Sequence, residues 1–206
     1  MIKIWGRTNS INVQKVMWTV GELGLDFERI DAGGPFGGLD TPEYGRMNPN
    51  RKIPTILDGS TIVWESNSCV RYLAAKYGAG SLWPEDPGLR SEADRWMDWM
   101  LTTLMPDMTI VFWQTIRTPP EKRDMAAVAA AAERLGPIWA LLDGHLADRP
   151  FVGGHSFTMG DIPVGCAWWR YRNLPIDRPP QPRIEAWFER LAARPAYRTH
   201  VMLPVT

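Results

Sequence analysis

The sequence predicts an α/β domain followed by an all-helical domain, and three observations support this prediction. Up to about Gly78, short strand-like runs alternate with runs at helical spacing. From about Asp86 onward only helical patterns occur. Between the two parts, Tyr77 to Gly88 contains three Gly and two Pro, a composition typical of a connecting segment. We therefore expect domains at residues 1–78 and 89–206, joined by a linker at residues 79–88.

The first half predicts the order strand, helix, strand, loop, two strands and helix. In the first helix, apolar residues recur at helical spacing and Gly24 closes the run. Asp58-Gly59 is a hairpin signal between the last two strands. The expected strands are Ile2–Trp5, Phe27–Ile30, Thr55–Leu57 and Thr61–Trp64; the expected helices are Ser10–Leu23 and Glu65–Tyr77, with a loop at Ala32–Gly45.

The second half predicts four helices. The first runs from Leu89 to about Thr115, and TPPE at Thr118–Glu121 has the cap and proline pattern of a second start. Pro137 should kink or end that second helix. In FTMGDI, at Phe157–Ile162, a threonine and an aspartate form a capping box, which predicts a stability device and a helix to about Tyr171. Arg183–Ala193 is expected to be the last helix.

Composition narrows the class of function. The formal net charge is zero, with 23 basic and 23 acidic residues, which argues against a nucleic-acid or anionic-membrane partner. Two distant cysteines and three scattered histidines favour neither a disulfide scaffold nor a metal site. We expect no signal region and no membrane-spanning stretch, so a cytoplasmic location fits. Most of the eleven Trp residues are expected in a bulky helical core.

The segment KIPTILDGSTIVWES, from Lys52 to Ser66, identifies a family when it is taken with the order of elements. In this combination the chain resembles a cytosolic glutathione S-transferase over nearly its whole length, of a bacterial, Ser-type kind (theta/delta-like or nu-like). The resemblance implies a thioredoxin-like first domain in which Pro54 follows a cis peptide bond. The bend would leave the N–H and C=O of Ile53 free to pair with the cysteinyl unit of glutathione, as in strand addition.

The resemblance also places the two charged ends of glutathione. Glu65 and Ser66 begin a helix, where free N–H groups and the helix dipole stabilise a carboxylate. They match the residues that hold the γ-glutamyl end in the family. Arg51 and Lys52 precede the bend and could pair with the glycyl carboxylate. Arg51 aligns best with the polar residue that the family often uses, whereas Lys52 could equally face solvent. Asn67 stands where some relatives have a basic residue, and we assign it no ligand contact.

Activation of the thiol is expected at the turn RTNSINVQKV, Arg7–Val16. Lowering a thiol pKa by about two units needs about 2.7 kcal/mol of extra stabilisation of the anion, which a hydroxyl and a helix N-terminus can supply. This stretch has no Tyr and no Cys, so the Tyr-type and Cys-type chemistries do not fit. Ser10 aligns with the activating serine, and Asn12 is a second donor; Thr8 and Asn9 are weaker candidates.

The expected function is a glutathione transferase that uses glutathione as its only cofactor, without a metal. Met105, Met108, Phe112 and Trp113 are expected to line a hydrophobic electrophile pocket between the halves. Two alternatives stay open: a glutathione-dependent disulfide reductase or peroxidase, and a non-catalytic binding module. The resemblance alone implies a homodimer and a role in detoxification.

Overall fold

A four-stranded mixed sheet forms the first half of the computed structural model, which describes residues 1–206. Strands β1 (Ile2–Trp5), β2 (Phe27–Ile30), β3 (Thr55–Asp58) and β4 (Thr61–Trp64) lie in the order β2-β1-β3-β4. β1 runs parallel to β2 and antiparallel to β3, and β3 pairs with β4 through the expected hairpin. The predicted strands and the α/β class are confirmed.

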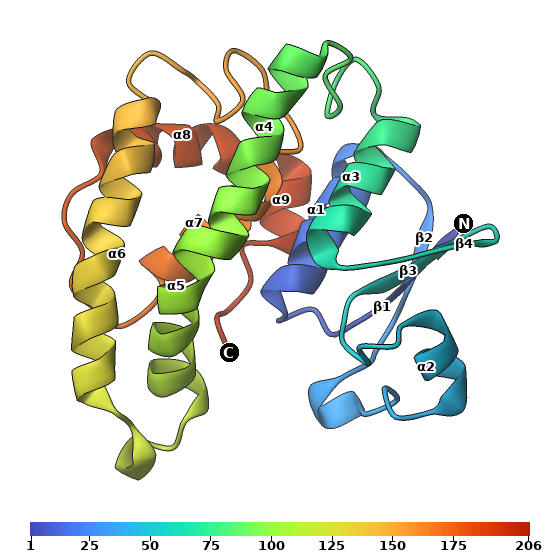
Figure 1. Ribbon diagram of the computed structural model, residues 1–206, viewed down its shortest axis with the longest axis horizontal. Helices are drawn as coiled ribbons and strands as arrows, with labels where there is room; N and C mark the ends of the chain where they lie inside the picture. The colour runs from blue at the N-terminus through green and yellow to red at the C-terminus, as the bar shows by residue number, and fades with distance from the viewer.

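Two helices pack on one side of this sheet and a short one lies on the other (Figure 1). α1 (Ile11–Glu22) and α3 (Ser66–Tyr77) form the first pair, and α2 (Pro42–Met47) lies opposite. A small core joins the sheet to α1 and α3; its members are Ile2, Ile4, Val13, Val16, Met17, Val20, Ile56, Cys69 and Leu73. The side chains at i, i+3 and i+4 of α1 thus bury against the sheet, as their spacing predicts.

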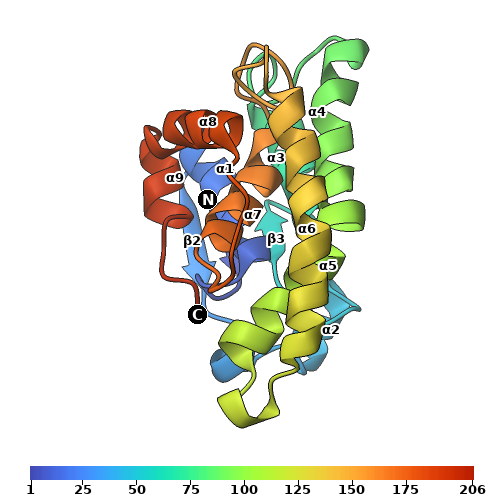
Figure 2. The same cartoon turned by 90° about the vertical axis from the view of Figure 1, so that its left-hand side faces the viewer.

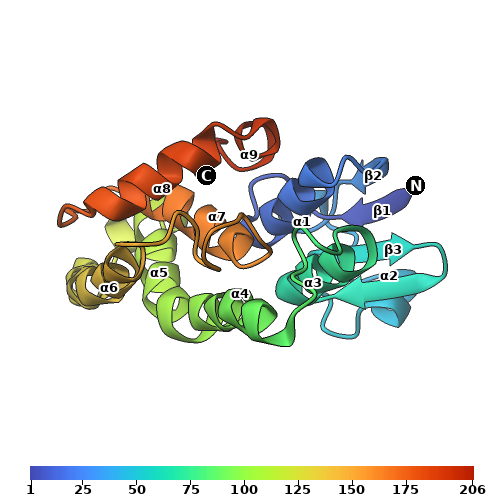
Figure 3. The ribbon, with the colours of Figure 1, turned by 90° about the horizontal axis from the view of Figure 1, so that it is seen from above.

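Only helices follow residue 86. They are α4 (Pro87–Trp99), α5 (Met105–Phe112), α6 (Met125–His145), α7 (Asp161–Arg172), α8 (Pro182–Ala192) and α9 (Pro195–His200). Figures 2 and 3 show α7 in the middle of this half, with α4, α5 and α6 on one side and α8 and α9 on the other. Trp139, Trp168 and Tyr171 pack against one another in the core of this half, so the expected tryptophan-rich packing is confirmed.

The two halves share one interface, because the helical core continues into α1. Ile11 and Trp18 of α1 belong to the same hydrophobic cluster as α7, and Trp18 packs against Phe157 and Tyr197. α1 therefore buries one side against the sheet and the other against the helical half. This double burial fixes the start of α1 between the halves.

Three helix predictions in the two halves need correction. α2 begins inside the expected loop at 32–45, because Thr41 caps the N–H of Tyr44 and Pro42 occupies the first helical position. The TPPE segment forms only a short 3₁₀ turn: Pro119 is held extended by the proline after it, and Asp124 caps α6. A helix also follows Ala193, since Pro195 opens α9.

The prolines inside the two long helices do not end them. α6 does not end at Pro137 but continues to His145, held by Leu135 and Trp139 in the core. The expected helix at 89–115 runs to Arg117 with two π-helical turns, at residues 100–104 and 113–117. The first of these turns lies just before Pro106, which lacks the N–H that an α-helical turn would use.

One expectation about membranes is also corrected. α6 is long and apolar enough, by length and composition, to cross a membrane. Its alanine-rich run gives it that composition, while Val128, Leu135, Trp139 and Leu142 pack into the helical core. A core helix of a soluble protein passes the same test.

Candidate functional site

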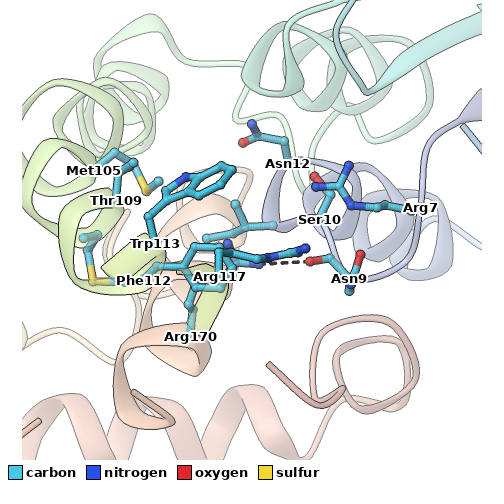
Figure 4. A pocket seen from close by; sticks show the side chains of 12 residues that line it. Arg7, Asn9, Ser10, Asn12, Met105, Thr109, Phe112, Trp113, Arg117 and Arg170 are labelled. Carbon is cyan, nitrogen blue, oxygen red and sulfur yellow. Dashed lines mark hydrogen bonds between the residues drawn. The ribbon is translucent and has the colours of Figure 1, made fainter. Parts of the chain in front are cut away.

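A cavity of about 230 Å³ opens between the two halves, and its walls come from four segments (Figure 4). The β1–α1 corner and the start of α1 form one wall, and the helix from α5 to Arg117 forms the opposite wall. α7 contributes Arg170. The lining residues are Arg7, Asn9, Ser10, Ile11, Asn12, Met105, Met108, Thr109, Phe112, Trp113, Arg117 and Arg170.

Ser10 stands at the N-terminus of α1 with a free side chain. Its backbone is extended, as in a capping residue, but its hydroxyl forms no capping hydrogen bond. The hydroxyl therefore remains available in the cavity wall, next to the unpaired first-turn N–H groups of α1. Asn12, two residues on, accepts from Ser66 and Lys15 through Oδ1, which leaves its Nδ2 as the free donor.

The bend before β3 has the geometry expected from the sequence. The Ile53-Pro54 peptide bond is cis. Neither the N–H nor the C=O of Ile53 forms a hydrogen bond within the chain. The bend lies against the β1–α1 corner, where a Cβ on Gly6 would meet Val13 at 2.4 Å and Ile53 at 3.4 Å. Only glycine permits this close approach, which brings the open backbone of Ile53 beside the first helix.

The start of α3 is likewise open. Glu65 precedes the helix with φ +66°, a conformation that non-glycine residues rarely adopt, and its side chain caps nothing. The first backbone N–H that is paired is that of Cys69, which bonds to the Glu65 carbonyl. The N–H groups of residues 66–68 thus have no partner within the chain, and the positive end of the dipole of a twelve-residue helix lies at the same place. This arrangement can hold a carboxylate.

A buried lysine, which the sequence analysis missed, joins the two helix starts. Lys15 is 0% exposed, and its Nζ donates to Asn12 Oδ1 at 3.1 Å, to Ser66 Oγ at 3.2 Å and to Asn67 Oδ1 at 3.3 Å. Burial lowers the pKa of Lys15 to about 8. A cation beneath the positive end of α3 raises the potential there and favours an anion. Its only sequence signal was a charge between the apolar positions of α1.

The two cations before the bend lie in different surroundings. Arg51 donates through Nη1 to the carbonyls of Leu39 and Thr41, so its guanidinium braces the loop before α2. Lys52 is exposed, while its backbone carbonyl accepts from Tyr44 and Asn48. These bonds hold the chain in place just before the bend.

Comparison with known proteins identifies the family. Residues 9–76 match the family model of the glutathione S-transferase N-terminal domain, and residues 125–190 match that of the C-terminal domain. The chain belongs to the glutathione S-transferase family. The family, the fold and the class of enzyme expected from the sequence are therefore confirmed.

Individual glutathione S-transferases match the chain over its full length. Glutathione S-transferase GstB of Escherichia coli (strain K12) is 41% identical and covers 100% of both chains. The theta class enzyme of Xanthomonas axonopodis pv. citri, with glutathione bound, is 45% identical, with a TM-score of 0.96 over 100% of this chain and 99% of that one. Its apo form aligns with a TM-score of 0.86 over 100% and 98%.

The cavity is more polar than the sequence predicted for an electrophile pocket. The four expected residues, Met105, Met108, Phe112 and Trp113, all line the cavity. Arg7, Arg117 and Arg170 line it as well, and the sequence analysis did not find them. Arg117 and Arg170 lie far apart in the sequence, so no local motif could have joined them.

Proposed function

We propose that this chain binds glutathione at the starts of α1 and α3 and activates its thiol for attack on an electrophile in the cavity. The observation that carries this proposal is the unbonded Ser10 hydroxyl in the cavity wall, together with the unpaired backbone N–H and C=O of Ile53. A free hydroxyl at a helix N-terminus can donate to a thiolate and hold its charge.

Each part of glutathione has a candidate partner. The cysteinyl unit would pair with the N–H and C=O of Ile53, after which Pro54 turns the chain into β3. The γ-glutamyl carboxylate would lie on the free N–H groups of α3 at Ser66, above Lys15. Glu65 would receive the ammonium group.

The glycyl carboxylate has two candidate partners, Arg51 and Lys52, whose surroundings differ. Arg51 would reach the carboxylate only by giving up one of its loop contacts, which lie at 2.9 and 3.2 Å. Lys52 is exposed and free to turn toward it. We propose Lys52 as the main partner here, with Arg51 stabilising the loop.

Ser10→Ala tests the assignment of the activating group. Turnover should fall by about 10²-fold, because removing one donor to a developing or resting anion costs this order of rate. Glutathione affinity should stay within a few-fold, since Ser10 contacts only the sulfur. An ultraviolet scan of the glutathione complex should show loss of the thiolate band at neutral pH. Unchanged turnover would transfer the role to Asn12 or Thr8.

A disulfide reductase is the second candidate, and one observation favours it. The hydrogen bonds from Lys15 and Ser66 hold the Asn12 carbonyl and leave its Nδ2 free in the cavity wall next to Ser10. Two neighbouring donors could stabilise the thiolate leaving group of a mixed disulfide. Parallel assays with a halogenated aromatic, a hydroperoxide and a small disulfide separate the two activities. Glutathione binding without thiolate formation or turnover would instead indicate a binding module.

The remaining assignments are proposals of the same kind. We place the domain boundary in the linker at 79–88, which runs from just after α3 into the first turn of α4. A homodimer, a cytoplasmic location and an electrophilic small molecule as partner follow from family membership. Sedimentation of the purified chain tests the dimer.

A further inference from the structure

Three guanidinium groups gather at one end of the electrophile cavity. Arg7 comes from the β1–α1 corner, Arg117 from the π-helical turn after α5, and Arg170 from α7. Figure 4 shows Arg7 beside Ser10, and Arg117 and Arg170 extending toward Asn9. Three segments that are distant in the sequence thus place positive charge next to the thiol-activating residue.

No acidic group neutralises this cluster. None of the twelve residues that line the cavity is acidic. None of the ion pairs in the chain includes Arg7, Arg117 or Arg170. The Nε of Arg7 is buried without a hydrogen-bond partner. These arginines therefore differ from the paired arginines elsewhere, such as Arg194, which holds Glu22 through two nitrogens.

The protein holds two of the cations in fixed positions. Arg170 is only 8% exposed, donates through Nη2 to the Asn9 carbonyl at 3.1 Å and lies 4.2 Å from the ring centre of Phe112. Arg117 lies 5.4 Å from the same ring and forms no hydrogen bond within the chain. The aromatic ring thus orders both guanidiniums without neutralising either. Burial, and the charges of Arg117 and Arg7, lower the pKa of Arg170 to about 10.

An unneutralised cluster of this kind is costly in the empty protein. Like charges within a few ångströms repel, and the low dielectric of a half-buried cavity strengthens the repulsion. Water solvates them incompletely there, so a carboxylate that enters the cavity gains charge-assisted hydrogen bonds and relieves the repulsion. A cavity that only admits apolar electrophiles would gain nothing from three free arginines.

We propose that the electrophile of this transferase carries a carboxylate, which Arg117 and Arg170 bind while its reactive carbon faces Ser10. This proposal rests on the proposed function and adds the substrate class to it. The apolar side chains of Met105, Met108 and Trp113 would contact the body of the substrate. Arg7 lies between this cavity and the loop at Gly33–Gly34, so it could serve either substrate.

The reaction can be written for an aryl halide. The glutathione thiolate forms a carbon–sulfur bond at the ring carbon that bears the halogen, and the halide leaves with the electron pair of the broken bond. The proton of the thiol has already gone to solvent. The carboxylate stays unchanged on the opposite side of the ring, where it serves only as the binding group.

Two substrates of nearly equal shape test the proposal: 4-chloro-3-nitrobenzoate, which is an anion, and 4-chloro-3-nitrobenzamide, which is neutral. For each, kcat/KM is divided by the rate constant of its uncatalysed reaction with glutathione, which removes the difference in intrinsic reactivity. The native chain should prefer the benzoate. Arg117→Gln should reduce that preference by about tenfold, as expected for the loss of one hydrogen bond to a charged group. Arg123→Gln is the control, since Arg123 lies outside the cavity and bonds to Thr118.

Two kinetic outcomes would overturn the proposal. One is a native chain that shows no preference for the benzoate. The other is a preference that survives Arg117→Gln while the KM for glutathione rises equally with both substrates, because the arginines would then serve the carboxylate of glutathione itself. If the chain turned over the benzamide but not the benzoate, the proposed substrate class would be refuted and the transferase function would stand.

Calorimetry separates failure of the proposal from failure of the function. The unreactive pair 3-nitrobenzoate and 3-nitrobenzamide is titrated into the native chain and into Arg117→Gln. Tighter binding of the benzoate, lost in the variant, would support the anion site even if neither chlorinated substrate is turned over. Equal binding of the pair would overturn it whether or not the chain is an active transferase.

Discussion

The N-termini of α3 and α7 both carry an acidic residue, but the two acids have opposite surroundings in the structure. At α7, Asp161 is fully buried and accepts hydrogen bonds from the N–H groups of Val152 and Thr158, both at 2.9 Å, and from Trp187 Nε1 at 2.8 Å. At α3, Glu65 caps nothing, has φ +66°, and leaves the first-turn N–H groups without partners.

This difference distinguishes a helix start that stabilises the fold from one that can bind a ligand. At α7 the first-turn N–H groups of Asp161 and Ile162 bond to the carbonyls of Thr158 and Met159, so this start contributes to folding and has no donor left for a ligand. A start whose donors are left open in water stabilises the fold less and can hold an anion. The start of α1 belongs to the second kind, because Ser10 forms no capping bond. The two open helix starts face the interface of the halves, and the satisfied one lies within the helical half.

Removing the acid of α7 should have the largest effect on folding. Asp161→Ala leaves two backbone N–H groups and the Trp187 indole N–H buried without acceptors, which should lower the free energy of unfolding by about 3–5 kcal/mol. Urea denaturation measures this change. Asp161→Asn retains one acceptor oxygen and should lose less. A loss below about 1 kcal/mol in the alanine variant would remove the contrast between the two helix starts.

The burial of Lys15 beneath α3 should make the free energy of unfolding depend on pH. Burial lowers its pKa from 10.5 to about 8 in the folded chain. The unfolded chain therefore binds more protons between pH 8 and 10.5, and the free energy of unfolding rises with pH across that window, by up to about 3 kcal/mol. Below pH 8 both states are protonated and the contribution is constant.

The measurement compares the native chain with Lys15→Met by urea denaturation at pH 7.5 and pH 9.5. The native chain should gain stability relative to the variant as the pH rises, while groups common to both cancel. Lys3→Met, on an exposed strand residue, serves as the control and should show no such trend. A difference that is flat or falls with pH would contradict a lowered pKa for Lys15.

Changing the acid of α3 should affect binding more than folding. Glu65→Gln removes the charge that would pair with the glutathione ammonium, and affinity should fall by about tenfold or more, as for a charge-assisted bond. The free energy of unfolding should change by less than about 0.5 kcal/mol, because Glu65 makes no side-chain cap. Calorimetry gives the affinity, with Glu85→Gln in the exposed linker as the control. Unaltered affinity would contradict the γ-glutamyl position.

The smallest expected effect is the difference in stability loss between variants at two helix N-caps. Asp86 accepts from the N–H of Leu89 at 2.8 Å, so Asp86→Ala should cost about 1 kcal/mol. Ser10→Ala should cost less than about 0.5 kcal/mol, because its hydroxyl caps nothing. Thermal unfolding of both variants checks the difference. An equal loss in the two would show that Ser10 does cap α1 in solution.

Local patterns predicted much of the fold. The strands, α1 and α3 follow from short-range signals that act within a few residues, and the cis bend at Ile53-Pro54 was implied by the family resemblance. The errors came where two local signals competed. In residues 32–45, abundant glycine obscured the Thr41-Pro42 helix start, and in TPPE the second proline cancelled the helix start that the first proline indicated.

The electrophile side was predicted only in part. Met105, Met108, Phe112 and Trp113 repeat along one helix face, so their spacing placed them together. Lys15 and Arg170 gave no comparable signal, because a charge on a helix is usually solvated. Their burial depends on α1 packing against the sheet and α7 at once.

The amino-acid sequence alone determined the family, the order of the elements and which residues could bind glutathione, because these depend on motifs and periodicities within short stretches of chain. The tertiary structure decided which helix starts stay open and which charges stay unpaired. Both depend on which groups meet: the folded packing alone brings Lys15 to its hydrogen-bond partner Ser66 and places the like charges of Arg117 and Arg170 in one cavity wall.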